Sequence, residues 1–315
     1  MSDPKASAGR PKIIGVGLVS LDFVVSTTVR SWAGGTCGNI MAILSYLGWD
    51  AYLVARLDTD AAGARVRADM ARWGVRLDFA GCGPTLPTPI IIEEIRRRRD
   101  GTPNHRFLWS CPHCGSRLPR FRPVTLGAAA AVLPIVRGAS AFFMDRVSPA
   151  ALALATRASA EGAVVVFEPS SPGDPDLFAA AIRIAHVVKY AAQLLPEMPV
   201  SNALLEVQTL GEQGLRYRYR SAPEWIFLAA VPAARLVDAC GAGDWCTAGL
   251  VAKLAAGGQA GLRQDGVRDA LRYGQALAAR NCGFEGARGG MYAADDVPEA
   301  VIACPGCRAP TLRAS

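Results

Sequence analysis

The sequence Val237-Asp238-Ala239-Cys240-Gly241-Ala242-Gly243-Asp244 stands between a short extended segment, 231–237, and an apolar stretch, 245–254, that predicts a buried helix. A glycine turn that opens a helix presents unpaired backbone N–H groups at the positive end of the helix dipole. Those groups suit a phosphate, or the charge that develops during phosphoryl transfer. Asp244 falls in the first helical turn, where its carboxylate could accept a proton from an attacking hydroxyl. On this motif alone, a simple chain turn with a capping aspartate is an equally good interpretation.

The composition sets the broad class. The chain has 315 residues, of which 51% are hydrophobic and 19% are charged, enough for one large α/β domain or two smaller ones. The formal charge of +7 is compatible with nucleic acid but equally with anionic small substrates. No run of 18 apolar residues occurs, and the polar segment 1–12 lacks the apolar centre of a signal peptide. We expect a cytoplasmic protein that binds a small molecule and neither nucleic acid nor a membrane.

Two glycine-rich segments lie near the N-terminus. Segment 12–20 predicts a buried first strand; its Gly15 and Gly17 suggest a dinucleotide site, but the third glycine is missing, so that signal is weak. Segment 31–48 is a glycine-rich approach to an apolar helix. The chain has no Gly-x-x-x-x-Gly-Lys-Ser/Thr stretch, which argues against a P-loop kinase.

Residues 238–244 with their apolar helix resemble the C-terminal signature of the PfkB (ribokinase-like) family of sugar and nucleoside kinases. Two N-terminal features add to the resemblance in the correct order, a first strand that ends near Asp22 and the pair Gly34-Gly35 followed by Asn39. The resemblance covers roughly 13–290. It implies an α/β fold, a ribokinase-like three-layer sandwich with a mostly parallel central sheet and a small β lid. We expect a single domain, 1–315, with lid strands from about 22–34 and 85–110.

The resemblance also implies roles for individual residues. Asp244 would be the catalytic base, and the anion hole would be formed by the backbone of Gly241, Ala242 and Gly243. Substrate hydroxyls would be held by Asp22, Gly34, Gly35 and Asn39. The cofactors would be ATP and Mg²⁺, with ATP contacted by Lys189, Thr209, Gly211 and Gly214. Segment 283–290 would line the adenine pocket and, in some members of the family, hold a monovalent cation. Ordinary structural roles remain open for Asp22 as a turn residue, Asn39 as a helix start and 204–219 as a plain hairpin.

The resemblance therefore implies an ATP-dependent phosphotransferase that acts on a hydroxyl of a sugar or sugar-like substrate, in a chain that could pair as a homodimer through its lid. Ala239 and the segment Tyr190–Leu194 depart from the family pattern. After Lys189 the family usually has a polar residue and then a glutamate that helps to order magnesium water, and neither is present here. Glu168 is the candidate to supply the missing charge. A nucleoside kinase and a non-catalytic metabolite-binding protein stay open as alternatives.

Two Cys-Pro-x-Cys motifs are not typical of the family: Cys111-Pro112-His113-Cys114 and Cys304-Pro305-Gly306-Cys307. Each is the shape of a zinc knuckle, in which a tight turn directs two thiolates at one ion. Two such pairs can complete a tetrahedral site of four thiolates, which leaves no open position and is therefore structural. We expect structural Zn²⁺ at Cys111, Cys114, Cys304 and Cys307, with His113 as an alternative ligand and two unrelated thiol pairs as the alternative interpretation.

The run Arg96–Arg99 follows an apolar strand and precedes a turn. Such a run is most often a solvated strand edge that blocks aggregation. The alternative is that it reaches an anionic group of the substrate together with His105 and Arg106, since arginine matches phosphate well.

Overall fold

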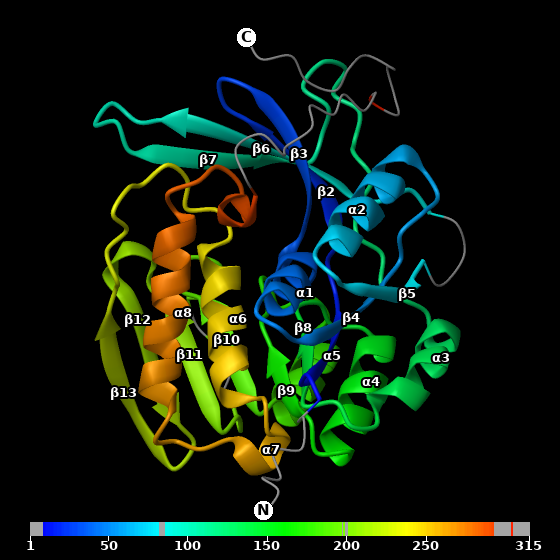
Figure 1. The fold of residues 1–315 in the computed structure, drawn as a ribbon, viewed down its shortest axis with the longest axis vertical. Coiled ribbons are helices and arrows are strands. Elements are labelled where there is room, and N and C mark those ends of the chain that lie inside the picture. Colours follow the sequence, from blue (N-terminus) through cyan, green and yellow to red (C-terminus); the bar gives the residue numbers. More distant parts are fainter. Residues whose placement is uncertain (1–8, 82–85, 197, 199–200, 293–303, 305–315) are drawn as a thin grey trace, which may run out of the picture.

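The computed structural model describes residues 9–81, 86–196, 198, 201–292 and 304 (Figure 1). A nine-stranded sheet runs through the molecule in the order β13-β12-β11-β10-β9-β8-β1-β4-β5. Its strands are β1 Lys12–Val16, β4 Asp50–Ala55, β5 Arg76–Ala80, β8 Ala141–Met144, β9 Val164–Phe167, β10 Val187–Ala191, β11 Leu205–Thr209, β12 Gly214–Tyr219 and β13 Ala222–Ala229. From β11 to β5 all neighbours are parallel, whereas β12 and β13 are antiparallel additions.

Helices cover both faces of this sheet. One face carries α1 (Thr36–Tyr46), α6 (Ala242–Leu254) and α8 (Val267–Asn281), with α2 (Ala61–Arg72) beside them; the other carries α3 (Leu126–Val136), α4 (Pro149–Ala160) and α5 (Pro175–Ile184). Successive residues of a strand point to opposite faces, so Phe143 joins the first core and Phe142 the second. Strands buried on both faces need continuous apolar runs, which is why Val164–Phe167 is wholly apolar. The expected three-layer α/β sandwich is confirmed.

A second sheet of four strands has the order β3-β2-β6-β7. It consists of β2 Ser20–Val25, β3 Val29–Gly34, β6 Ile90–Arg97 and β7 Pro103–Leu108, and it lies at one end of the molecule as the small lid (Figure 1). β2 pairs with β6 in parallel, and the outer pairs are antiparallel. The remaining short elements are α7 (Gly258–Gly261) and the 3-10 turns η1 (Gly211–Gln213) and η2 (Gly289–Met291).

The expected first strand, 12–20, is wrong in its extent. β1 ends at Val16, and Ser20 already begins the lid strand β2. The change of direction occurs at Gly17, where an added Cβ would overlap the carboxyl group of Asp145. Gly15 and Gly17 thus make room for Met41 and Asp145, a packing role that accounts for the glycines without a dinucleotide.

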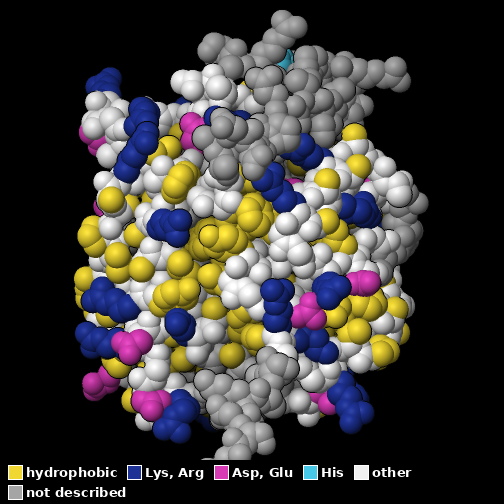
Figure 2. All heavy atoms as spheres, viewed as in Figure 1, with side chains coloured by type: hydrophobic (Ala, Val, Ile, Leu, Met, Phe, Trp, Pro, Cys, Tyr) yellow, Lys and Arg dark blue, Asp and Glu magenta, His cyan; other side chains and the backbone are white. Residues whose placement is uncertain are grey.

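The arginine run forms the exposed tip of the β6–β7 hairpin. Arg96 pairs with Glu94 at 2.7 Å, and Arg97 donates to the Gly101 carbonyl at 3.0 Å. These bonds stay within the hairpin, as a solvated edge requires. On the face shown in Figure 2, Lys and Arg side chains are scattered rather than gathered into one patch. No helix in the described part of the chain is long and apolar enough to cross a membrane.

Candidate active site

The turn before α6 is locked by its own aspartate. Asp238 Oδ1 accepts from the Cys240 N–H at 2.9 Å, and Oδ2 accepts from the Gly286 N–H at 2.8 Å. Gly241 follows with φ 73°, in the left-handed region, and a side chain there would collide with Ala287. The hydrogen bonds of Asp238 and the close approach of Gly241 to Ala287 therefore fix the orientation of the first turn of α6.

The amides of this turn are not equivalent. The Ala242 N–H donates to the Ala239 carbonyl at 3.2 Å. Those of Gly241 and Gly243 have no acceptor among the residues that the structure describes. They are open donors at the positive end of α6, the arrangement that binds anions.

Asp244 lies in the first turn of α6 and keeps part of its surface exposed. Its Oδ2 accepts a hydrogen bond from Asn39 Nδ2 at 2.7 Å. Desolvation in this recess and the nearby charge of Glu168 raise the pKa of Asp244 to about 7, although Asn39 and Lys189 oppose the rise. A carboxylate with a pKa near neutrality is well matched to take a proton and give it up again.

Asp22, Gly34 and Gly35 come together as expected. Gly34 lies so close to the Asp22 carboxyl group that an added Cβ would overlap it. Gly35 caps α1 with φ 78°. Burial raises the pKa of Asp22 to about 6, against hydrogen bonds from Ser20 and the Gly35 backbone. The Ser20 hydroxyl donates to Asp22 Oδ1 at 2.6 Å.

The Cys240 thiol lies among acidic groups. Desolvation and then the charges of Glu93, Asp238, Asp22 and Asp244 raise its pKa. The acidic volume near this thiol therefore draws on the lid, on the turn and on the first turn of α6.

Glu93 of β6 is the lid's contribution to that volume. Its carboxyl oxygen, an Asp238 oxygen and a His105 ring nitrogen lie within 4.8 Å of one another. Glu93 is 2% exposed, and its Oε1 has no hydrogen-bond partner among the described residues. Burial, followed by the charge of Asp238, raises the pKa of Glu93 to about 8. An unsatisfied buried oxygen beside a reaction site is available to a ligand.

Arg288 is buried beneath the site with 2% exposure. Its Nε donates to Asn39 Oδ1 at 3.0 Å, and one Nη donates both to Asp69 at 2.9 Å and to the Ala33 carbonyl. Tyr292 completes the group by donating to Asp69 at 2.7 Å. Arg288 thereby fixes which end of the Asn39 amide faces Asp244.

A buried ion pair supports the turn from the other side. Lys189 Nζ donates to Glu168 Oε1 at 2.5 Å, and the Thr247 hydroxyl donates to Oε2 at 2.5 Å. Both Lys189 Nζ and Glu168 Oε1 lie 3.8 Å from the position that a Cβ on Gly243 would take. The pair therefore sits directly under the open amides.

Two acids follow neighbouring parallel strands at their carboxyl ends, Asp145 after β8 and Glu168 after β9. Asp145 Oδ1 accepts from the Leu18 N–H at 2.9 Å. Burial raises the pKa of Asp145 to about 6 despite the neighbouring Arg146. In open α/β sheets, ligands bind at this edge.

Three of the four expected nucleotide residues, Thr209, Gly211 and Gly214, lie at the same edge, around the β11–β12 connection. Thr209 ends β11, and its hydroxyl donates to the Tyr190 carbonyl at 3.4 Å. Gly211 has φ 62°. A Cβ added at Gly211 would lie 3.5 Å from Gln193 Nε2. Gly214 has a different reason for being glycine, because a Cβ would overlap the backbone of β13.

The comparisons with known proteins agree with this geometry. The model of the pfkB family carbohydrate kinases matches residues 135–293, just over half of the chain. The chain belongs to this family. No curated protein sequence matches it.

Solved structures of pfkB-type kinases share the fold. Ribokinase from Arabidopsis thaliana, solved with ribose and ATP, is 19% identical, with a TM-score of 0.65 over 88% of this chain and 94% of that one. Aminoimidazole riboside kinase from Salmonella enterica is 19% identical, with a TM-score of 0.67 over 87% and 95%. The nucleoside kinase from Burkholderia thailandensis, solved with inosine, is 17% identical, with a TM-score of 0.62 over 88% and 92%.

In this pfkB kinase, the two motif regions singled out in the sequence meet, since Asn39 contacts Asp244. Lys189 is 1% exposed and engaged with Glu168, so it lies below the turn rather than on an open surface. Cys111, Cys114 and Cys304 gather elsewhere, and Cys307 lies outside the described residues.

Sequence reasoning missed Asp145, Arg288 and Glu93 as site residues. Asp145 carried a usable signal, because it directly follows a four-residue apolar strand, as Glu168 does. Glu93 carried a weaker one, as an acid that continues the apolar run 90–92. Arg288 carried none, since an arginine in a glycine-rich loop is ordinary.

Proposed function

We propose that this kinase transfers a phosphoryl group from ATP to a hydroxyl of a sugar or sugar-like substrate, with Asp244 as the base. The observation that carries the proposal is the 2.7 Å hydrogen bond between Asn39 and Asp244. It brings the N-terminal glycine-rich segment, suited to holding hydroxyl groups, against a carboxylate at the positive end of a helix.

In the proposed reaction, the substrate hydroxyl loses its proton to Asp244 while its oxygen forms a bond to the γ-phosphorus. The bond from that phosphorus to ADP breaks, and ADP leaves with the electron pair. Because the pKa of Asp244 is raised to about 7, the carboxylate is ionised in a useful fraction of molecules and still basic enough to accept the proton. Transfer of this kind depends mainly on positioning and on charge stabilisation.

The open amides of Gly241 and Gly243 would stabilise the negative charge of the phosphoryl group in transfer. The Ala242 amide would add to them by sharing its hydrogen between Ala239 and the phosphoryl oxygens. Lys189 would act from below, by bringing a positive charge under the turn while it donates to Glu168. These donors are fixed before the substrate binds, so little reorganisation accompanies the reaction.

The edge of the sheet fits a nucleotide and a divalent cation. At Gly211 an added Cβ would meet no atom closer than Gln193 Nε2 at 3.5 Å, so a phosphate group could approach the backbone beside the β11–β12 connection. Glu168 and Asp145 supply carboxylates there, and each Glu168 oxygen accepts one hydrogen bond and keeps a further lone pair. Glu168 would hold Mg²⁺ through water, in place of the acid that the segment after Lys189 lacks. Mg²⁺ supplies neutralisation of charge on the phosphate oxygens.

The substrate would be held between the lid and the N-terminal segment. Asp22 and Asn39 would bind its hydroxyl groups. Glu93 Oε1, which has no hydrogen-bond partner in the part of the chain that the structure describes, would accept from one of them. Nucleosides carry the same ribose hydroxyls, so a nucleoside kinase is the second candidate, favoured by the fold shared with the riboside and nucleoside kinases.

The test is ADP release from ATP and Mg²⁺ over a panel of free sugars, sugar alcohols and nucleosides. We expect at least one substrate with turnover, and a loss of about 10²- to 10⁴-fold in kcat for Asp244→Asn with unchanged circular dichroism. Asp265→Asn, at an exposed aspartate, is the matched control. Absence of turnover with every compound would favour a metabolite-binding protein, and full activity of Asp244→Asn would rule out the proposed base.

A further inference from the structure

The first Cys-Pro-x-Cys motif forms the turn of a small hairpin that follows β7. Ser110 and Arg117 pair as an isolated antiparallel bridge. The Cys111 N–H donates to the Ser116 carbonyl at 2.8 Å, and the Gly115 N–H donates to the Cys111 carbonyl at 2.9 Å. Cys111 and Cys114 therefore project from one tight turn.

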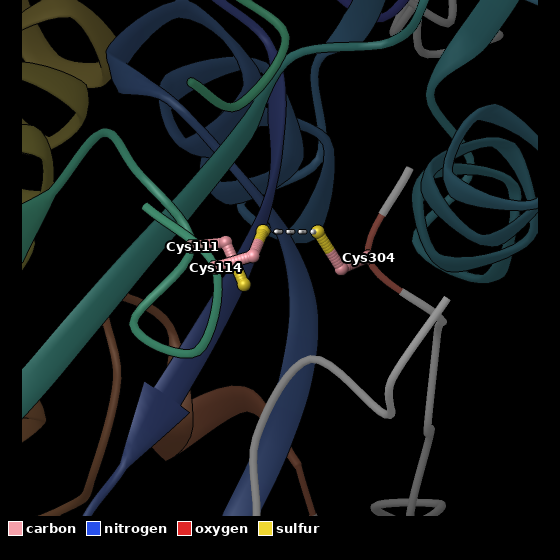
Figure 3. Close-up of side chains that lie close together, drawn as sticks. All are labelled: Cys111, Cys114 and Cys304. Carbon is pink, nitrogen blue, oxygen red and sulfur yellow. Dashed lines mark hydrogen bonds between the residues drawn. The ribbon is translucent and has the colours of Figure 1, made fainter. Parts of the chain in front are cut away.

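A third cysteine reaches this turn from the other end of the sequence. Cys304 and Cys114 are 190 positions apart, and their sulfurs lie 3.8 Å from each other. The sulfurs of Cys111, Cys114 and Cys304 all lie within 4.8 Å of one another. Figure 3 shows the three side chains side by side, with the contact between Cys114 and Cys304 dashed. Cys111 and Cys304 are buried, with 2% and 1% exposure.

The separation of the sulfurs distinguishes two kinds of link. A disulfide would bring two sulfurs to about 2.05 Å. Two sulfurs that each bind one zinc ion at about 2.3 Å in a tetrahedron lie about 3.8 Å apart. The distance of 3.8 Å between the Cys114 and Cys304 sulfurs is too long for a disulfide. It is the distance of a hydrogen bond between two thiols, and it is also the separation that a shared zinc ion requires.

We propose that Cys111, Cys114 and Cys304 are ligands of one structural Zn²⁺. The fourth ligand expected from the sequence, Cys307, lies outside the described residues. With a fourth thiolate the ion would have no position for a substrate and would have no part in the reaction. It fastens the chain at Cys304 to the hairpin. The segment that follows the hairpin is joined to the lid by a backbone hydrogen bond, in which the Ile90 N–H of β6 donates to the Pro119 carbonyl at 3.1 Å.

The experiment is elemental analysis of the full chain, purified without added metal and without metal-affinity chromatography. We expect one zinc per chain, and loss of at least nine-tenths of it in Cys111→Ser, Cys304→Ser and Cys307→Ser. Cys282→Ala, at a buried cysteine outside the cluster, and His113→Ala, at the exposed histidine of the turn, should both keep it. Replacement of zinc by Co²⁺ should give the intense near-ultraviolet charge-transfer bands of a site with several thiolates.

Because zinc content needs no assay of activity, this test is independent of the proposed reaction. Iron in place of zinc, no metal, or a Cys114–Cys304 disulfide found by mass spectrometry of the unreduced protein would each overturn the proposal. So would zinc that survives Cys304→Ser or that is lost in His113→Ala. Circular dichroism identifies a variant that fails to fold. In that case the wild-type chain is compared with and without a chelator, which replaces the comparison of the wild-type chain with the variant.

Discussion

Asn39 Nδ2 donates to Asp244 Oδ2 across 2.7 Å, although the two residues are 205 positions apart in the chain. The orientation of the amide follows from its second contact. An arginine can only donate, so the Asn39 oxygen must face Arg288 and the Asn39 nitrogen must face Asp244. The buried Arg288 thus determines that Asn39 donates a hydrogen bond to the Asp244 carboxylate in the first turn of α6.

Removing the Asn39 side chain should move the pH dependence of the reaction. The hydrogen bond from Asn39 lowers the pKa of Asp244, which burial raises to about 7. In Asn39→Ala the pKa should rise further, so the acidic limb of the kcat/KM profile should move to higher pH. A pH–rate series for wild type and variant measures this shift. Asn202→Ala, at an exposed asparagine, should leave the limb in place, and a limb that moves to lower pH would contradict the assignment.

Arg288→Lys should produce the same shift by a different route. Lysine keeps the positive charge but lacks the planar donor that holds Asn39. We expect kcat/KM to fall about ten- to a hundredfold, in line with the loss of a hydrogen bond worth about 1.5–3 kcal/mol. Because the two residues act in one chain of contacts, combining Arg288→Lys with Asn39→Ala should cost little more than the worse single change.

The control for this double-mutant cycle is Arg280→Lys, at an exposed arginine of α8. It should change kcat/KM by less than about twofold, because surface substitutions have small effects. Full additivity of the two changes at Arg288 and Asn39 would show that Arg288 does not act through the amide.

Glu93→Gln should stabilise the protein at alkaline pH. Burial and Asp238 raise the pKa of Glu93 to about 8, and Asp22 adds to the effect; the Cys240 thiol opposes it, and His105 lies alongside. A raised pKa means that the favourable contribution of the protonated acid is complete below the ordinary value and is lost as the pH rises through about 8. Glutamine stays neutral, so the variant should exceed wild type by up to a few kcal/mol at pH 9 and match it near pH 4.

Urea unfolding at the two pH values measures this difference. Glu224→Gln, at an exposed glutamate, should show no such dependence on pH. If Glu93→Gln is less stable than wild type at pH 9, Glu93 is ionised and paired in the folded state, and the expectation is wrong.

The parts of the site that the sequence predicted are those whose chemistry lies in a few consecutive residues. Gly241 needs a positive φ and Gly34 makes room for a carboxyl group, and both requirements appear in the sequence as glycine. The three layers were likewise expected from the resemblance to the family, and a strand buried on both faces such as Val164–Phe167 is apolar throughout.

The parts that could not be predicted depend on contacts between distant segments. Nothing local distinguishes Arg288 from a surface arginine; its role arises only when the loop after α8 packs against Asn39. The early end of β1 has a similar cause, since Asp145, which follows the distant strand β8, occupies the space beside Gly17. Asp145 itself could have been found by asking which acids follow apolar strands.

The ion pair between Lys189 and Glu168 should be costly to break from one side. Lys189 is 1% and Glu168 13% exposed in their side chains. Lys189→Met should lower the free energy of unfolding by about 3–5 kcal/mol, because it leaves a desolvated carboxylate without its cation. Adding Glu168→Gln should recover part of this loss. Urea unfolding of both variants measures the two steps.

The comparison for this pair is Arg157→Met, which breaks an exposed pair with Glu161 in α4. That change should cost no more than about 1 kcal/mol. A cost for Lys189→Met as small as that of Arg157→Met would show that Glu168 is well solvated.

Gly249→Ala should destabilise the protein although alanine favours helices. Gly249 of α6 and Gly274 of α8 let the two helices touch, and a Cβ on Gly249 would lie 2.5 Å from the Gly274 Cα. Overpacking of this kind costs about 1–3 kcal/mol, more than the gain of about 1 kcal/mol in helix propensity. Gly127→Ala in α3 is the matched control, because its Cβ would meet nothing closer than 4.0 Å and should be neutral or stabilising. Since Asp244 opens α6, a displaced helix should lower kcat as well as the melting temperature, whereas a stabilised Gly249→Ala would show that the helices have room to separate.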